Sequence, residues 1–501
     1  MLKDDPIANV LTIDLERKTH RIDRRDDLFD AYIGGTGVAT KLLLDLCPQG
    51  CDPLAPENPI ILAIGPMTGA YPLASKTVAM FKSPLTGDLG ESHCGGRSAL
   101  AIRNAGYGAI VIVGKSDIPI YVSIQEHKVF FRNATTIWGM SSNATAGKII
   151  RANEPGAGYR TIMRIGKAGE KLIPYASVTA ETYRHFGRMG LGAVFGSKNL
   201  KAVVVSGKGK YPVSDVKAYR TLYDELYQSA VRSPLMKKYH DLGTSININV
   251  LNGIGALPTR NVTAGKFELA GNISGEHLAE HYLGRRLACT GCPVACIHIA
   301  SLREPYDDEA YFYKTTSVSY DHELIYAAGS MLGIGNPEHF LKLMDEIDKV
   351  GLDVITTGAT LAWATEAFKK GLIGTGQTGG IVPEWGDHLA YIKMVKAIVE
   401  QPTGFFQDLA KGSHFASKKH GGQDFAMTFG KNEMAGYHTG PAGYIGFAIG
   451  ARHSHLDNAG YSVDQKTLME KEVPAEWVVD QLVKEERWRQ VISSITICFF
   501  A

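Results

Sequence analysis

The 501-residue sequence lacks several features that would place it in other classes of protein. It has no uninterrupted apolar run of about 18 residues, so no membrane span is predicted. It has no run of basic residues, and its formal net charge of only +2 argues against nucleic-acid binding. Its first residues form neither an apolar leader nor a twin-arginine signal, which predicts a cytoplasmic location.

Cysteine is also scarce, and its distribution is informative. Seven cysteines, an odd number, do not form a disulfide framework, and Cys289, Cys292 and Cys296 follow a C-x2-C-x3-C spacing. Thiolates select an iron–sulfur cluster or zinc. Zinc usually takes two Cys pairs or a Cys pair with a His pair, and no second C-x-x-C is present. A 4Fe–4S cluster completed by the distant Cys498 is therefore favoured, with structural zinc and unliganded cysteines as the alternatives.

The hydrophobic pattern divides the chain into a β-rich first part and a mainly helical second part. With 45% apolar residues, the chain can build two or three domains. Short β-branched runs bounded by Gly, Pro or Asp predict strands at 60–64, 109–113, 118–124 and 202–205. Helix-period segments follow at 216–231, 335–350 and 359–371. We place the boundary between the two parts near 207–212, and a softer one near 374–380.

Glycine is abundant, with 55 residues, and four glycine-rich stretches fall in the β-rich part. They lie at 33–37, 65–69, 92–96 and 184–193. Turns of this kind can present backbone N–H groups to a phosphate. None of them matches a P-loop or a dinucleotide fingerprint. Together with Lys76, Arg184 and Arg188, they predict a site for an anionic organic cofactor.

These motifs resemble those of the aldehyde ferredoxin oxidoreductase family of tungsten–pterin enzymes. The resemblance runs nearly from end to end and is carried by segments 33–37, 82–87, 104–107, 187–201, 257–261, 289–296 and 348–353, and by Cys498. It implies an α+β fold in which a β-rich base domain, 1–208, is capped by two mainly helical domains. The first, 209–400, carries the cysteine triplet and a D-x-x-G-L-D motif. The second, 401–501, is expected to be incomplete, because family members continue well past the last cluster cysteine.

The resemblance also implies the cofactors and the residues that hold them. Members carry a tungsten (or molybdenum) bis-pterin whose phosphates are bridged by Mg²⁺, and a 4Fe–4S cluster on Cys289, Cys292, Cys296 and Cys498. The phosphate and magnesium contacts fall on Lys76, His93, Gly95, Arg184, His185, Gly187 and Arg188. Positions 76 and 93 depart from the family, which has Arg and Asn there.

Two D-x-x-G-L-(D or C) motifs are expected to bind one pterin each. The first is present as Asp348, Leu352 and Asp353. The second is represented by Ser493, Ile497 and Cys498, and it has Ser493 in place of Asp and Thr496 in place of Gly. The anchoring of the second pterin is therefore expected to differ from that of other members.

The resemblance places the chemistry on Glu323 and His455. A carboxylate in a dry pocket has a raised pKa and can act as a base on water, and a nearby histidine can donate a hydrogen bond to the substrate oxygen. Without the resemblance, Glu323 would be interpreted as an ordinary solvated helix carboxylate. His322 stands where other members have Tyr, and with His438 and His453 it indicates either packing groups or a substrate other than a simple aldehyde.

The implied reaction is the oxidation of a small aldehyde to a carboxylic acid, or the reverse, with electrons passing through the cluster to ferredoxin or another iron–sulfur subunit. Arg285 and Arg286 are candidates for docking that partner, although exposed arginines are more often simply solvated. One alternative is the same fold acting on an acid, a thioester or an aryl group. Another is a non-catalytic electron-transfer subunit that has lost the pterin.

Two further expectations concern the enzyme class and the assembly. A molybdenum–pterin enzyme of the formate dehydrogenase or nitrate reductase type is disfavoured, because it would show an N-terminal ferredoxin-like cysteine run. The segment 337–350 lacks the E-x-x-H motif of iron-bridged dimers, so a homodimer of another kind is left open.

Overall fold

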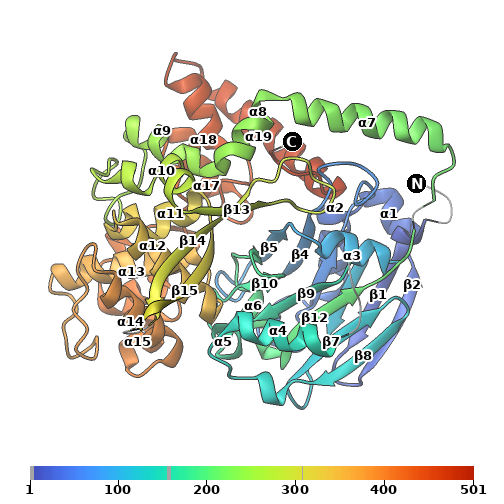
Figure 1. Ribbon diagram of the computed structural model, residues 1–501, viewed down its shortest axis with the longest axis horizontal. Coiled ribbons are helices and arrows are strands. Elements are labelled where there is room, and N and C mark those ends of the chain that lie inside the picture. Colours follow the sequence, from blue (N-terminus) through green and yellow to red (C-terminus); the bar gives the residue numbers. More distant parts are fainter. Residues whose placement is uncertain (1–4, 155–158, 211, 307–308, 501) are drawn as a thin grey trace.

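The computed structural model describes residues 5–154, 159–210, 212–306 and 309–500. Its first part contains two six-stranded sheets (Figure 1). The first sheet has the order β2-β1-β6-β3-β4-β5, formed by Asn9–Asp14 (β1), Thr19–Arg24 (β2), Ile60–Ala63 (β3), Thr77–Lys82 (β4), Leu89–Cys94 (β5) and Ala109–Val113 (β6). The second has the order β11-β10-β9-β12-β7-β8, formed by Ile120–Gln125 (β7), Lys128–Asn133 (β8), Thr161–Ile165 (β9), Val178–Ala180 (β10), Arg184–Phe186 (β11) and Leu200–Ser206 (β12).

Alternation along the strands explains why the first sheet is buried on both faces. Leu11 and Ile13 point to a core shared with the second sheet and with helices α3 (Ser98–Asn104) and α6 (Leu191–Ser197). Val10, which precedes Leu11, points to the opposite face, where α1 (Asp26–Tyr32) and α2 (Gly35–Leu46) pack. Because side chains on a strand alternate in direction, strands β3 and β6, which are apolar at every position, fit a sheet covered on both sides.

The remaining chain is mainly helical and contains the largest core. That core gathers α9 (Asn247–Gly253), α10 (Gly275–His281), α11 (His322–Ala328), α12 (Pro337–Val350), α13 (Val354–Lys369), α14 (His388–Glu400), α15 (Gly404–Leu409) and α16 (Ser413–His420). The other helices are α4 (Asn143–Asn153), α5 (Lys167–Glu170), α7 (Val216–Arg232), α8 (Pro234–Leu242), α17 (Pro441–Ile449), α18 (Gly460–Val463) and α19 (Ala475–Ile495). The predicted β-rich first part and helical second part are confirmed.

A three-stranded antiparallel sheet interrupts the helical part and was not predicted. It consists of β13 (Leu283–Leu287), β14 (Ile297–Tyr306) and β15 (Glu309–Tyr320), which project between the two parts of the molecule in Figure 1. Strand β13 is half-exposed or exposed along its whole length. Its sequence therefore lacks the alternation of apolar and polar residues by which a half-buried strand is predicted.

Helix α19 docks onto the base through closely packed backbone. A Cβ at Gly35, the first residue of α2, would lie 2.2 Å from the carbonyl oxygen of Ser493, and one at Gly65 would lie 2.6 Å from that of Ser494. Glycine is therefore required at both positions for the C-terminal segment to reach the base. The division at 208/209 and 400/401 stays a prediction. Within the described ranges, no helix has both the length and the apolarity that crossing a bilayer would require.

Candidate functional site

The cysteine triplet and Cys498 are brought together by a single residue of the base domain. The triplet lies on the loop between β13 and β14, and Cys498 follows α19. The backbone N–H of Leu73, on the loop between β3 and β4, donates to the carbonyl of Gly291 at 3.4 Å. The carbonyl of Leu73 accepts from the N–H of Cys498 at 3.1 Å. The loop between β3 and β4 is thereby bonded both to the segment that carries the cysteine triplet and to the segment that carries Cys498.

Two cations lie beside these sulfurs. A Cβ at Gly95 would lie 2.7 Å from the Sγ of Cys289 and 3.4 Å from the Nε of Arg184, so glycine allows the three to pack. Burial opposes ionisation of Cys289, but the charges of Arg184 and Lys76 outweigh it and lower the pKa of the thiol. The thiolate is the form that binds iron. Burial likewise opposes the charge of Lys76, and the sulfurs of Cys498, Cys289 and Cys296 raise its pKa.

A structural zinc site and a 4Fe–4S cluster, the two alternatives for these cysteines, need different arrangements of ligands. In the part of the chain that the structure describes, no three His, Cys, Asp or Glu side chains are placed to hold one metal ion. A structural zinc site needs four such ligands around a single ion. A 4Fe–4S cluster takes one thiolate on each of four irons, so its sulfurs lie farther apart.

The D-x-x-G-L-D motif forms the junction between α12 and α13. Helix α12 ends at Gly351, whose φ of +80° is readily adopted by glycine. The side chain of Asp353 caps α13 by accepting hydrogen bonds from the N–H groups of Ile355 and Thr356. Its Oδ2 also lies 3.6 Å from the Nε of Arg188. The motif therefore connects a helix start to a cationic residue of the base domain.

The first aspartate of the motif faces a histidine of β11. Asp348 Oδ1 lies 3.6 Å from His185 Nε2. Burial raises the pKa of Asp348 to about 7 and lowers the pKa of His185 to about 3. Near neutral pH the imidazole of His185 is therefore uncharged, and Asp348 is poised between its protonated and ionised forms.

Several buried polar atoms around this region have no hydrogen-bond partner among the described residues. They include the Nε of Arg184 and both the Nε and the Nη1 of Arg188. A Cβ at Gly187, between them, would meet no atom within 4 Å. Buried guanidinium N–H groups without acceptors are costly unless an anion satisfies them. The donor set and the adjacent open space therefore fit the phosphate groups of an anionic cofactor.

Glu323 and His455 face each other near Arg188. Glu323 lies in the first turn of α11, whose N-cap is Asp321. Its Oε2 accepts a hydrogen bond from the N–H of Gly436 at 3.1 Å, and its Oε1 lies 3.5 Å from His455 Nε2. Burial raises the pKa of Glu323 to about 8, so the group is mostly protonated at neutral pH. Burial, followed by the charge of Arg188, holds the pKa of His455 well below its usual value.

His322 is fully buried beside this pair. Its Nε2 donates to the carbonyl of Gly436 at 3.0 Å, which leaves Nδ1 without a described partner, and burial lowers the pKa of the ring to about 4. Tyr437, which the sequence analysis missed, lies between this ring at 4.6 Å and that of His455 at 4.8 Å. No described contact joins His438 or His453 to Glu323, since these rings contact the Tyr444 hydroxyl and the Phe447 carbonyl.

Comparison with known families matches almost the whole chain. Residues 10–207 match the family described as aldehyde ferredoxin oxidoreductase, N-terminal domain, and residues 221–501 match its domains 2 and 3. The chain belongs to the aldehyde ferredoxin oxidoreductase family. It is thus an oxidoreductase of that family, and the resemblance inferred from the motifs is confirmed.

Individual relatives agree with this assignment. The tungsten-containing aldehyde ferredoxin oxidoreductase of Pyrococcus furiosus is 33% identical over 431 residues, which is 85% of this chain and 68% of the relative. The enzyme of the same name from Thermococcus kodakarensis is 32% identical over 434 residues, again 85% and 68% of the two chains. An aliphatic sulfonate oxidoreductase, WOR-like subunit, from Pyrococcus furiosus is 32% identical over 430 residues, 82% of this chain and 67% of that one.

A solved structure shares the fold. It is the active-site complex BamBC of a benzoyl coenzyme A reductase, solved with 1,5-dienoyl-CoA, and it aligns with a TM-score of 0.81 at 22% identity. The alignment covers 99% of this chain and 81% of that one. At this identity the likeness establishes the fold of the family and leaves the substrate open.

The segment predicted to be the second pterin motif forms the C-terminal end of helix α19. Thr496 stands where the family has Gly, and it adopts a left-handed φ of +60° at the C-terminus of α19. Its hydroxyl accepts a hydrogen bond from the N–H of Gly65 at 3.1 Å and lies 2.9 Å from the hydroxyl of Thr68. Ser493 is buried, and the N–H of Ile497 donates to the carbonyl of Ile492 at 3.1 Å. The substituted hydroxyl thus bonds the helix end to the base domain.

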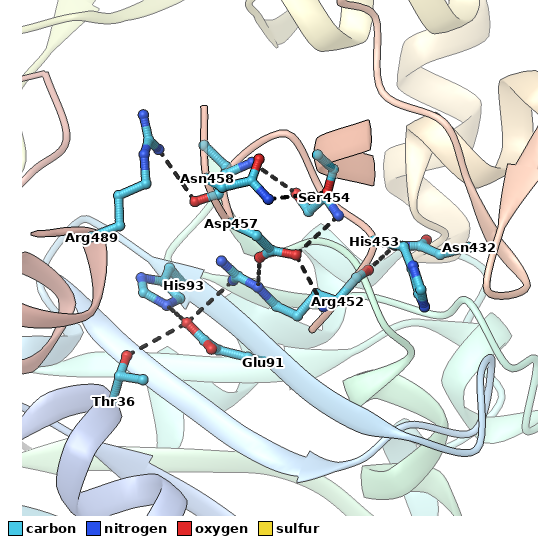
Figure 2. A network of polar contacts seen from close by, with 12 residues as sticks. Thr36, Glu91, His93, Asn432, Arg452, His453, Ser454, Asp457, Asn458 and Arg489 are labelled. Atoms are coloured by element: carbon cyan, nitrogen blue, oxygen red, sulfur yellow. Dashed lines mark hydrogen bonds and ion pairs between the residues drawn. The ribbon is translucent and has the colours of Figure 1, made fainter. Parts of the chain in front are cut away.

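His93 is engaged in a buried ionic network that the sequence analysis did not predict (Figure 2). Its Nε2 contacts Glu91, which also accepts from Arg452 Nη1 at 3.2 Å. Arg452 Nε donates in turn to Asp457 Oδ1 at 2.7 Å. Burial opposes the charge of Glu91, but Arg452 and His93 outweigh it and lower its pKa to about 2. The sequence did hold one indication of this contact. Glu91 and His93 are two residues apart on β5, and this spacing places both side chains on the same face of the strand.

The role of His93 as a magnesium contact stays a prediction, as do the roles of the other site residues.

Proposed function

We propose that this chain is a tungsten–pterin enzyme that oxidises a small aldehyde to a carboxylic acid, or catalyses the reverse reduction. Electrons would pass through a 4Fe–4S cluster on Cys289, Cys292, Cys296 and Cys498 to a ferredoxin. The observation that carries the proposal is the buried Glu323–His455 pair beside Arg188. The Nε and Nη1 of Arg188 have no hydrogen-bond acceptor among the described residues, whereas its Nη2 donates to Asn432 and to the carbonyl of Glu433.

Some side chains would bind the cofactor, and others would accept a proton or donate a hydrogen bond during the reaction. Lys76, Arg184 and Arg188 would hold the anionic cofactor, and Mg²⁺ would help to neutralise the charge of its phosphates. When bound, the tungsten–pterin group would accept the two electrons removed from the substrate carbon. Ionised Glu323 would take a proton from the water that adds to the carbonyl carbon. His455, neutral and close to Glu323, would donate a hydrogen bond to the carbonyl oxygen as negative charge develops on it.

Metal analysis combined with an activity assay tests this proposal. Anaerobically purified protein should contain tungsten and about four irons per chain, as expected for one such cluster. It should also reduce a viologen dye when given a small aldehyde. Molybdenum in place of tungsten would correct the metal and leave the reaction intact. Iron without either metal, and no dye reduction, would instead identify a non-catalytic electron-transfer subunit.

A second candidate is the same chemistry on another substrate, and His322 favours it. The imidazole replaces the tyrosine of other members, and its Nδ1, close to the proposed site, has no hydrogen-bond partner among the described residues. The relatives named for aliphatic sulfonate and benzoyl coenzyme A make an acid, a thioester or an aryl substrate worth testing. His322→Tyr should shift the ratio of kcat/KM values between an aldehyde and such a substrate. An unchanged ratio, with unchanged metal content, would remove His322 from the specificity determinants.

The proposed ferredoxin would dock near β13, where Arg285 and Arg286 are exposed. Each also makes one local contact, Arg285 to the hydroxyl of Tyr183 at 3.2 Å and Arg286 to the carbonyl of Asp241 at 3.3 Å. Reversing both charges to Glu should slow ferredoxin reduction and leave viologen reduction unchanged. Equal loss with both acceptors would show that the arginines matter for folding only. A homodimer and a cytoplasmic location stay predictions. Residues 1–4, on which the prediction of location partly rests, lie outside the described ranges.

A further inference from the structure

A cavity of about 520 Å³ lies at the junction of the base domain and the C-terminal helices, away from Glu323 and the cysteines. One wall comes from the base domain, where Leu85, Lys171 and Pro174 contribute. The opposite wall comes from α16 and its surroundings, where Lys418 and Phe415 contribute. Ligand sites commonly form in clefts of this size between domains.

The charge of this cavity is of one sign. Four lysines line it, Lys171, Lys411, Lys418 and Lys431, and none of the lining side chains is acidic. Within the described part of the chain, none of the four forms an ion pair, whereas lysines elsewhere, such as Lys167 and Lys369, do. A cleft lined by one sign of charge concentrates the field and attracts counter-ions. The chain as a whole has a formal net charge of only +2, so this concentration is local.

The positive charge of the lysines also affects the pKa of a histidine in the cavity lining. His414 lies in the lining. Burial, followed by the charges of Lys418 and Lys431, lowers its pKa below the ordinary value. The ring is therefore mostly neutral near neutral pH, and it can donate or accept a hydrogen bond without adding to the charge.

The remaining lining is apolar and aromatic. Leu85, Ile173, Pro174 and Ala410 contribute, and the ring of Phe415 remains 39% exposed with the Nζ of Lys411 lying 4.3 Å above it. Lysine ammonium groups bind phosphates as point charges, and an exposed ring offers a stacking surface. The geometry points to a binding site for a small organic phosphate, one with a flat apolar group and at least two phosphate charges. This site is independent of the proposed redox function.

The experiment is calorimetric titration of the anaerobically purified holoenzyme with ADP, pyrophosphate and adenosine at low salt. ADP should bind at one site, more tightly than either fragment, and pyrophosphate should compete with it. Lys171→Gln combined with Lys418→Gln removes one charge from each wall and should weaken ADP binding by about tenfold or more, as expected for two charge-assisted contacts.

The matched control is Lys148→Gln combined with Lys393→Gln, which removes the same net charge from two exposed lysines outside the cavity that form no ion pair with any described residue. This control should bind ADP like the parent. An equal loss in both double variants would show non-specific attraction and overturn the proposal. Absence of binding by both ADP and pyrophosphate would also overturn it. Reduced affinity for an acidic ferredoxin in the cavity variant, with no ADP binding in the parent, would replace it with a protein-docking surface.

Discussion

At the scale of single residues, burial fixes the protonation state of the proposed catalytic groups. Glu323 and His455 lie together, yet the pKa of the carboxyl is raised to about 8 and that of the imidazole is depressed. The pair is therefore neutral at neutral pH, with the proton on the glutamate. A base of this kind becomes available only when the proton leaves, so its activity depends on pH.

We predict that the activity on an aldehyde rises with pH through about 8, because only the ionised carboxylate of Glu323 accepts a proton. Glu323→Gln should remove this rise and reduce kcat by roughly 10²–10⁴-fold, the usual contribution of a general base. The measurement is the pH profile of kcat/KM with viologen as acceptor.

Glu433→Gln is the matched control for this prediction. Glu433 is also fully buried and its pKa is raised to about 7, but its Oε1 accepts hydrogen bonds from Ser413 rather than facing His455. Its substitution should keep the alkaline rise. Loss of the rise in the control variant, or its persistence in Glu323→Gln, would contradict the assignment of the base.

At the scale of elements, the site depends on how helices begin and end. Gly351 ends α12, Asp353 begins α13, and Thr496 ends α19 against Gly65. Each terminus has backbone groups that the helix itself cannot satisfy, so each must find a partner outside it. The carboxylate of Asp353, within the D-x-x-G-L-D motif, caps α13, and the hydroxyl of Thr496 bonds the end of α19 to Gly65 of the base domain. The positions of the site residues therefore depend on where these helices begin and end.

We predict that Asp353→Ala lowers the free energy of unfolding by about 0.5–2 kcal/mol through loss of the α13 cap, and also lowers the tungsten content. The second effect follows from the contact with Arg188 at 3.6 Å. Scanning calorimetry and metal analysis measure the two effects separately.

Asp387→Ala supplies the control for this prediction. Asp387 caps α14 in the same way, accepting from Leu389 and Ala390, but at an exposed position away from Arg188. Its loss should lower stability within the same range and leave the metal content unchanged. A fall in tungsten content with Asp387→Ala would show that the loss reflects general instability.

At the scale of the whole molecule, a buried ionic network links the base to the C-terminal part. Glu91 lies on β5, and Arg452 lies on the loop after α17 that also carries His455. The two charges are almost completely removed from water, so their attraction is little screened. Removing Glu91 would leave Arg452 with Asp457 as its remaining buried acidic partner, and His93 without the carboxylate that it contacts.

We predict that Glu91→Gln lowers the free energy of unfolding by about 1–3 kcal/mol at neutral pH, because Arg452 and His93 lose a charged hydrogen-bond partner while Asp457 still pairs with Arg452. Because the pKa of Glu91 is lowered to about 2, its contribution is present above the ordinary glutamate pKa and is lost as pH falls toward 2. The measurement is the melting temperature between neutral and acid pH.

The control is the exposed pair between Lys369 and Glu384. Glu384→Gln should cost only about 0–1 kcal/mol, because water screens exposed ion pairs. Similar losses from the two substitutions would contradict the claim that the buried network joins the two parts.

The family and the broad fold followed from sequence alone, because they depend on local patterns. Apolar strands such as 109–113, the helix at 337–350 and the spacing of Cys289, Cys292 and Cys296 are all readable within a few residues. The exposed strand β13 was missed, because it lacks the alternation that prediction uses.

The sequence by itself thus determined which residue types are available and which segments form strands and helices. Only the tertiary structure decided that Leu73 bridges Gly291 and Cys498, that Glu91 meets Arg452, and that four lysines without an ion pair among the described residues line one cavity. The physical reason is distance along the chain. Contacts between residues hundreds of positions apart leave no local periodicity, and the pKa of a buried group depends on neighbours that folding alone brings to it.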